Sequence, residues 1–164
     1  MGLDLALYRE KQYQQNEQTN KWSEGELAYG RKTWSLVYTF KQLTGVIDKD
    51  YEMIVPFEAL QEFVSTYQPI FKQWEDWIAS YTHLDYVLYY QDEESIDLNE
   101  QEQQSLESAY LTLENLLEQG LSFIDSAQLG LAWELRAWVK WIEAIQKEVN
   151  DPEHDSAYRL VVSY

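Results

Sequence analysis

The chain of 164 residues contains no cysteine. Disulfide bonds, thiolate catalysis and cysteine-ligated zinc sites are therefore excluded, and a reducing compartment suits such a chain. Long apolar runs are also missing, since no stretch approaches the roughly 18 residues of a membrane span. The opening MGLDLALYREKQ lacks the basic and apolar parts of a secretory signal. We therefore expect a cytoplasmic protein.

Positive charge is scarce. Twelve Lys and Arg residues stand against 29 Asp and Glu residues, which gives a formal net charge of −17 and a pI near 4.3. Residues 73–135 hold 14 acidic residues and no Lys or Arg, and QDEESIDLNEQEQQ (91–104) holds six of them. Such a chain repels nucleic-acid backbones and anionic membranes, so we expect direct binding to neither. A partner attracted by charge should be basic.

Apolar and aromatic residues, in contrast, are plentiful. Hydrophobic residues make up 45% of the chain and aromatic residues 15%, including seven Trp and thirteen Tyr. This composition excludes intrinsic disorder despite the charge. We expect one domain over residues 1–164, with an aromatic core whose indole and phenol groups have polar partners at its margins.

Hydrophobic periodicity predicts a small sheet and several helices. Leucines at every second position of residues 3–8 are typical of a half-buried strand, and residues 51–56 and 158–164 are also strand-like. Because unpaired terminal segments fray, the N- and C-terminal strands should pair. The expected fold is α+β and predominantly helical, with four to five helices and a small antiparallel sheet of these three strands.

Local signals set the expected helix boundaries. Residues 12–22 look like a polar loop, and Ser23 with Glu26 fits a capping box that opens a helix ending near Gly45. Pro56 is expected as the first residue of the next helix, which Pro69 should break or kink. Further helices are expected from Asp97 to about Gly120 and from about Ser126 to Val149, whereas residues 85–91 are ambiguous between strand and helix.

Three stretches carry a family resemblance. They are MGLDLALYREK at the start, ELAYGRKTWSLVYTF (26–40), and the aromatic, strand-like C-terminal end. Together they resemble an uncharacterised family of small phage and prophage proteins that begin Met-Gly-Leu-Asp and carry a Tyr-x-Arg-Lys helix. Tyr29, Arg31 and Lys32 match that helix, and Gly30 stands where the family more often has Trp. The resemblance implies a phage or prophage origin and an α+β fold, without an assigned chemistry.

The acidic segment is the first candidate site. On a helix opened at Asp97, four glutamates spaced seven, seven and four apart fall in one narrow stripe, about 6 to 10 Å apart along the axis. A row of anions at that spacing resembles a nucleic-acid strand and could occupy a basic groove. The alternative is a solvated face that keeps the protein soluble. The candidate partner-binding residues are Glu93, Glu94, Asp97, Glu100, Glu107, Glu114 and Glu118.

A second candidate lies where the resemblance is densest. Arg31 and Lys32 are expected to begin a helix, where they could bind an anion or form an internal ion pair with a carboxylate. With Asp4 and Tyr29 they could also line a small-ligand or enzyme site if a concave pocket joins them.

Catalytic and metal signatures are weak. The chain has two histidines and no HExxH, GxSxG, GxGxxG or P-loop motif. The DPEHD segment (151–155) could suggest a metal site, but its proline and its position after a helix favour a turn. We expect no cofactor and no metal, and an enzyme is the less favoured interpretation.

These observations favour an acidic phage-type protein that acts by binding in the host-cell cytoplasm. It would occupy a basic surface of a host or defence protein, as a nucleic-acid mimic or inhibitor. Two alternatives remain open. One is a structural or accessory phage protein whose acidic face only keeps it soluble, with homodimerisation through its aromatic region. The other is the small-ligand or enzyme site around Tyr29, Arg31 and Asp4.

Overall fold

A computed structural model describes most of the chain outside residues 81–127. The described residues are 4–31, 33–44, 52–80, 100, 101, 104, 108, 111 and 128–163. The strands are β1 (Asp4–Arg9), β2 (Ala28–Arg31), β3 (Glu52–Pro56) and β4 (Ala157–Ser163). The helices are α1 (Glu10–Thr19), α2 (Trp34–Thr44), α3 (Phe57–Ser80) and α6 (Gln128–Val149). The α+β class is therefore confirmed, and no helix within the described part is long and apolar enough to cross a membrane.

The four strands form one antiparallel sheet in the order β2-β1-β4-β3. The predicted pairing of the terminal strands is confirmed, because Leu5 lies opposite Val162 and Leu7 opposite Leu160. These four side chains are buried. Because they recur at every second position, this register of the two strands places all four on the face that packs against the core. The predicted strand near residues 51–56 is also confirmed and forms one edge of the sheet. The other edge, β2, was not predicted.

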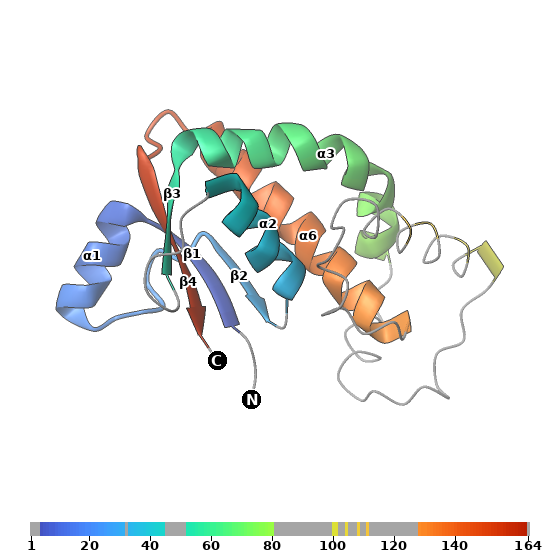
Figure 1. Cartoon of the computed structure of the whole chain (residues 1–164), viewed down its shortest axis with the longest axis horizontal. Helices are drawn as coiled ribbons and strands as arrows, with labels where there is room; N and C mark the ends of the chain where they lie inside the picture. Colours follow the sequence, from blue (N-terminus) through green and yellow to red (C-terminus); the bar gives the residue numbers. More distant parts are fainter. Residues whose placement is uncertain are drawn as a thin grey trace.

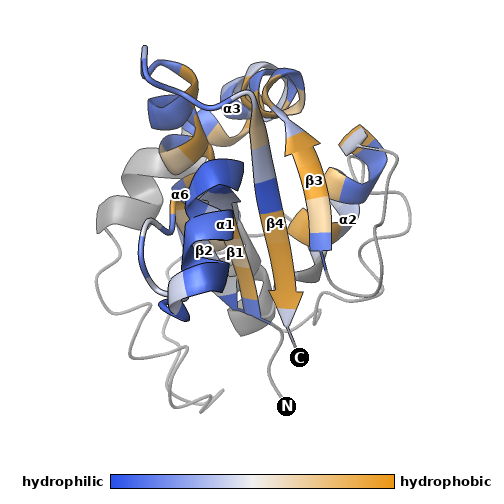
Figure 2. Cartoon of the chain, turned by 90° about the vertical axis from the view of Figure 1, so that its left-hand side faces the viewer, coloured by the Kyte–Doolittle hydropathy of each residue, from blue (hydrophilic) through white to orange (hydrophobic). Residues whose placement is uncertain are grey.

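Helices lie on both faces of the sheet. Figure 1 shows α2, α3 and α6 on one side of it and α1 on the other. In Figure 2 the hydrophilic α1 stands in front of β1, with β4 and β3 in view beside it, while α2 and α6 lie behind. The hydrophobic core fills the space between the sheet and helices α2, α3 and α6. Helix α1 lies on the opposite face of the sheet and contributes no residue to this core.

Aromatic rings join α3 to α6 in this core. Trp138 is fully buried, and its ring stacks on Phe71 at 4.9 Å and 4° and on Phe63 at 5.6 Å and 18°. Its indole N–H donates to the Ser35 hydroxyl at 2.8 Å, so the expected polar partner of a buried Trp is present. Each ring removed from water contributes about 1.5–3 kcal/mol, which makes this stack a main source of stability.

The expectation of a loop at residues 12–22 was wrong, since residues 10–19 form α1. This helix buries only Tyr13 and Asn16, three positions apart, too short a stripe for periodicity to reveal. The Asn16 side chain donates to the backbone carbonyl of Glu24 at 2.7 Å. Helix α1 is therefore held by specific side-chain contacts rather than by an apolar face.

The predicted helix start at Ser23–Glu26 was also wrong. This stretch is a turn that leads into β2, and the Leu27 N–H donates to the Leu7 carbonyl at 2.8 Å, extending the ladder. Ala28 and Gly30 are buried while Tyr29 and Arg31 are exposed, which fits the two-residue period of a strand. Pairing in the sheet therefore prevails over the helix that the capping box predicted. Arg31 consequently ends a strand, and α2 begins only at Trp34.

Pro69 does not break its helix. Helix α3 continues through it, and Figure 1 shows the helix bending over its C-terminal part. Pro69 and Ser65 are both exposed, so the carbonyl that loses its N–H partner can be solvated. Core contacts of Ile70 and Phe71 hold the segment after the proline. Pro56 ends β3 instead of opening this helix, a difference of one residue.

The remaining helix predictions agree with the structure where it describes them. Helix α6 begins two residues later than expected and ends at Val149 as predicted. The five described residues between 100 and 111 are all helical, in agreement with a helix opened at Asp97. Residues 85–91 lie outside the described residues.

Candidate functional site

The sheet face that carries α1, here called the open face, displays side chains in ordered rows. The antiparallel register places Tyr29, Ala6, Val161 and Glu52 in one row across all four strands. Tyr29 remains 51% exposed at one end of this row. A second row contains Tyr8, Arg159 and Ile54, and a third contains Arg31, Asp4 and Ser163.

Arg159 ties α1 to the open face. Its guanidinium binds both carboxylate oxygens of Glu10, with Nε–Oε2 3.0 Å and Nη2–Oε1 2.6 Å, and its Nη1 lies 2.8 Å from Glu52 Oε2. The guanidinium carbon also sits 4.6 Å from the centre of the Tyr13 ring. The Glu10 hydrogen bond, opposed by burial, raises the pKa of Arg159 above its ordinary value. This arginine is thus a fixed cation that joins β4, β3 and α1.

Tyr13 completes this cluster. Its hydroxyl donates to Glu52 Oε1, so Glu52 bridges the phenol and the guanidinium. Burial, followed by the hydrogen bond to Glu52, raises the pKa of Tyr13 above the ordinary 10.0. The phenol therefore stays protonated at neutral pH and acts as a hydrogen-bond donor, not as a base.

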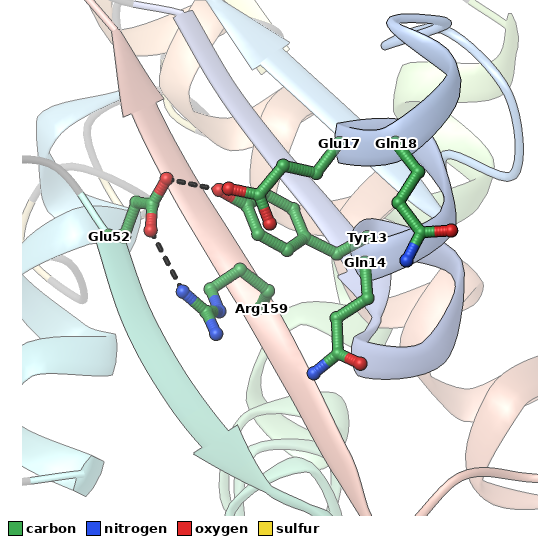
Figure 3. Close-up of a pocket in the computed structure, with 6 residues that line it drawn as sticks. All are labelled: Tyr13, Gln14, Glu17, Gln18, Glu52 and Arg159. Carbon is green, nitrogen blue, oxygen red and sulfur yellow. Dashed lines mark hydrogen bonds and ion pairs between the residues drawn. The ribbon is translucent and has the colours of Figure 1, made fainter.

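A hollow of about 440 Å³ opens beside this cluster, between α1 and β3. Its lining residues are Tyr13, Gln14, Glu17, Gln18, Glu52 and Arg159, as drawn in Figure 3. Glu17 is exposed and makes no hydrogen bond or ion pair with any residue that the structure describes. With Glu10 included, the hollow and its margin hold three carboxylates and one guanidinium, so the negative charge is in excess.

A second polar cluster anchors the C-terminal end of β1. Glu148 is only 5% exposed, and it accepts two hydrogen bonds from Arg9, at 2.6 and 3.0 Å, and one from the Tyr158 hydroxyl at 2.9 Å. Asp151 also binds Arg9 at 3.1 Å. Asp155 accepts the backbone N–H of Lys11 at 3.2 Å. Each charged group in this cluster has a hydrogen-bond or ion-pair partner, which is the arrangement of a structural clamp.

The predicted Asp4, Tyr29 and Arg31 do meet on the open face. The Tyr29 hydroxyl donates to Asp4 Oδ1 at 2.9 Å, and Arg31 Nε lies 3.9 Å from the same oxygen. These residues do not line the hollow beside Arg159, so the concave pocket predicted around them is not this one. Lys32 lies outside the described residues.

Glu100 is the one predicted acidic partner-binding residue among those that the structure describes. Glu100 is helical and exposed. The others lie outside the described residues: Glu93, Glu94, Asp97, Glu107, Glu114 and Glu118.

The DPEHD segment forms a turn, as the sequence predicted. Asp151 Oδ1 accepts the Glu153 N–H at 2.9 Å, and the His154 ring stacks on Phe57 at 3.7 Å and 3°. Within the part of the chain that the structure describes, His, Asp and Glu side chains form no group of three that could hold a metal ion. His154 is therefore a packing residue.

Sequence reasoning missed the hollow. Tyr13, Glu17, Glu52 and Arg159 come from three elements, and Arg159 is 107 positions from Glu52. One available signal was a charged residue inside each of the two predicted strands, at positions 52 and 159. Charges at alternate strand positions point away from the core, so both had to lie on the open face.

No protein-family model, curated protein or solved structure matches the chain. The chemistry of the described side chains is therefore the basis for a proposed function. The open face is the surface that the structure describes in most detail.

Proposed function

We propose that the chain is an acidic phage-type binding protein that occupies a basic surface of a host or defence protein, as a nucleic-acid mimic or inhibitor. It would act by contact alone, in the cytoplasm of the host cell. The observation that carries this proposal is that the arginines of the described sheet are held by the protein's own carboxylates, while a large excess of negative charge remains.

Arginine is the residue best suited to bind phosphate. Whether the arginines are available or already paired therefore distinguishes a nucleic-acid partner from a basic protein partner. Arg9 binds Glu148 and Asp151, and Arg159 binds Glu10 and Glu52. Arg31 faces Asp4. Nucleic acid would find few available cations here and a net charge of −17 opposing it. A basic protein would be attracted by the same field.

The acidic stripe supports mimicry. Residues 73–135 contain 14 carboxylates and no Lys or Arg, so i,i+4 ion pairs cannot form within this window. The four glutamates Glu100, Glu107, Glu114 and Glu118 form one stripe only if they lie on a helix, and Glu100 is helical. Carboxylates about 6 to 10 Å apart along one side of a helix would present anions in a row to a groove that normally holds phosphates.

The test is capture of partners from a bacterial lysate by the tagged full chain, at low and at high salt. The variant replaces Glu100, Glu107, Glu114 and Glu118 with Gln. A matched control replaces four exposed glutamates elsewhere, Glu24, Glu58, Glu62 and Glu153, and so removes the same charge. Far-ultraviolet circular dichroism of each variant checks that the fold is retained.

We expect a basic, nucleic-acid-handling protein that the wild type and the control retain at low salt and that the stripe variant loses. Capture should weaken with salt, because a contact between exposed charges is screened. Equal capture by all three proteins, or capture that does not depend on salt, would contradict the proposal.

A further inference from the structure

The open face has a part that α1 does not cover. Helix α1 packs over the row of Tyr8 and Arg159 through Tyr13 and Glu10. The next row runs from Tyr29 through Ala6 and Val161 to Glu52 at the hollow. Ala6 and Val161 are partly exposed, and Ile54 beside the hollow is 43% exposed. An aromatic and aliphatic strip therefore leads across the sheet into an acidic hollow.

The charges along this strip are one-sided. Arg31 faces Asp4, and Arg159 is held by Glu10 and Glu52. Counting Glu17 as well, four carboxylates stand against two guanidinium groups, and both of these already face carboxylates. An apolar strip with a carboxylate rim is the composition of a protein-docking surface, and its charge selects a cationic occupant.

The hollow has the chemistry for one cationic side chain. Its volume of about 440 Å³ lies within the range of about 300–1,000 Å³ that ligand sites occupy. Figure 3 shows Gln14, Glu17 and Gln18 projecting from α1, with Glu52 and Arg159 on the sheet side. Carboxylate and amide oxygens accept hydrogen bonds from ammonium or guanidinium groups. Because Arg159 and Tyr13 already fix Glu52, this acceptor is oriented before a ligand arrives.

We propose that the strip from Tyr29 to the hollow docks an extended basic segment of the protein partner, with one Lys or Arg side chain entering the hollow and meeting Glu17 and Glu52. This inference rests on the proposed function, because it names the kind of segment by which the basic partner is held. The aliphatic part of that segment covers Val161 and Ala6, and its remaining cations face the carboxylate rim.

The test uses the isotope-labelled full chain and a tetra-arginine peptide, capped at both ends, with a tetra-citrulline peptide as the neutral probe of equal shape. Amide chemical shifts are followed during titration of each peptide. The variant is Glu17→Gln, which leaves the described ion pairs of Arg159 intact. The control is Glu62→Gln, an exposed carboxylate on α3 with the same charge change. Tyr29→Ala probes the other end of the strip.

We expect tetra-arginine to shift the amides of residues 13–18, 52 and 159–161, and tetra-citrulline to leave them unchanged. Glu17→Gln should weaken tetra-arginine binding about fivefold, the effect of losing one partly exposed charge-assisted contact, whereas Glu62→Gln should not. Shifts spread over the surface, with equal weakening by both variants, would overturn the docking site in favour of diffuse attraction. Shifts absent from the hollow would do the same.

Partner capture separates this inference from the proposed function. Loss of capture by the stripe variant with full capture by Glu17→Gln would overturn the docking site and leave the proposed function standing. Loss of capture by Glu17→Gln with full capture by the stripe variant would support the docking site and remove the acidic stripe from the contact.

Discussion

The guanidinium of Arg159 lies 4.6 Å from the centre of the Tyr13 ring, and Glu52 binds both residues. This relationship joins a helix with little apolar surface to the sheet. It also builds one wall of the hollow, so the contacts that stabilise α1 also shape the candidate docking site.

Arg159→Ala should destabilise the protein by about 2–3 kcal/mol, because it leaves Glu10 and Glu52 without the cation they share. Urea unfolding followed by circular dichroism measures this change. Lys21→Ala is the matched control, since its 3.6 Å pair with Glu24 is exposed and should contribute less than about 0.5 kcal/mol. Equal effects of the two substitutions would contradict the role given to Arg159.

Stability should fall as the pH rises above about 10. Burial, with the hydrogen bonds to Glu52 and Glu148, raises the pKa values of Tyr13 and Tyr158 above 10.0. The unfolded chain then loses these protons first, so alkaline pH favours the unfolded state. The free energy of unfolding, measured by urea titration between about pH 8 and about pH 11, should therefore decrease.

Tyr13→Phe tests the assignment of this titration. Removing one titrating phenol should reduce the slope of stability against pH above about pH 10 by up to about 1.4 kcal/mol per pH unit. Near neutral pH the same substitution should cost about 1 kcal/mol for the lost hydrogen bond to Glu52. An unchanged alkaline slope would show that Tyr13 has an ordinary pKa in the folded protein.

Glu148→Gln should destabilise the protein by about 2–3 kcal/mol. The substitution keeps the shape of the side chain but removes the buried charge that holds Arg9 and accepts from Tyr158. Glu153→Gln in the following exposed turn is the control and should change stability by less than about 0.5 kcal/mol. Thermal and urea unfolding of both variants provide the comparison, and a neutral Glu148→Gln would remove the structural role of this clamp.

Thr33→Val and Ser35→Ala should have opposite effects although both sites are buried. The Thr33 hydroxyl oxygen has no hydrogen-bond partner among the residues that the structure describes, so replacing it with a methyl group should be neutral or stabilise by up to about 1 kcal/mol. Ser35→Ala leaves the buried Trp138 N–H unpaired and should cost about 1–2 kcal/mol. Urea unfolding of both variants decides, and a large loss in Thr33→Val would indicate a partner for its hydroxyl.

The sequence predicted the elements whose apolar residues repeat over several turns or alternations. Helix α6, β3 and the paired terminal strands were found because each carries enough buried residues to show its period. Helix α1 and β2 were missed for the same physical reason. Each has one buried apolar side chain, Tyr13 in α1 and Ala28 in β2. The second buried residue of each, Asn16 or Gly30, adds no apolar side chain that could reveal a period.

Properties that add up along the chain could be derived from the sequence: the net charge, the absence of thiol chemistry, the supply of aromatic residues for a core, and the α+β class. These properties depend on composition and on spacing along the chain. Which charges compensate one another follows only from the folded arrangement of the strands and helices. Glu10, Glu52 and Arg159 are far apart in sequence, yet each of the two carboxylates lies within 3.0 Å of the Arg159 guanidinium because β4 lies beside β3 and α1 packs over it. Coulomb interactions and hydrogen bonds depend on such distances, so the hollow and the place of Glu17 in its lining are decided only in the folded protein.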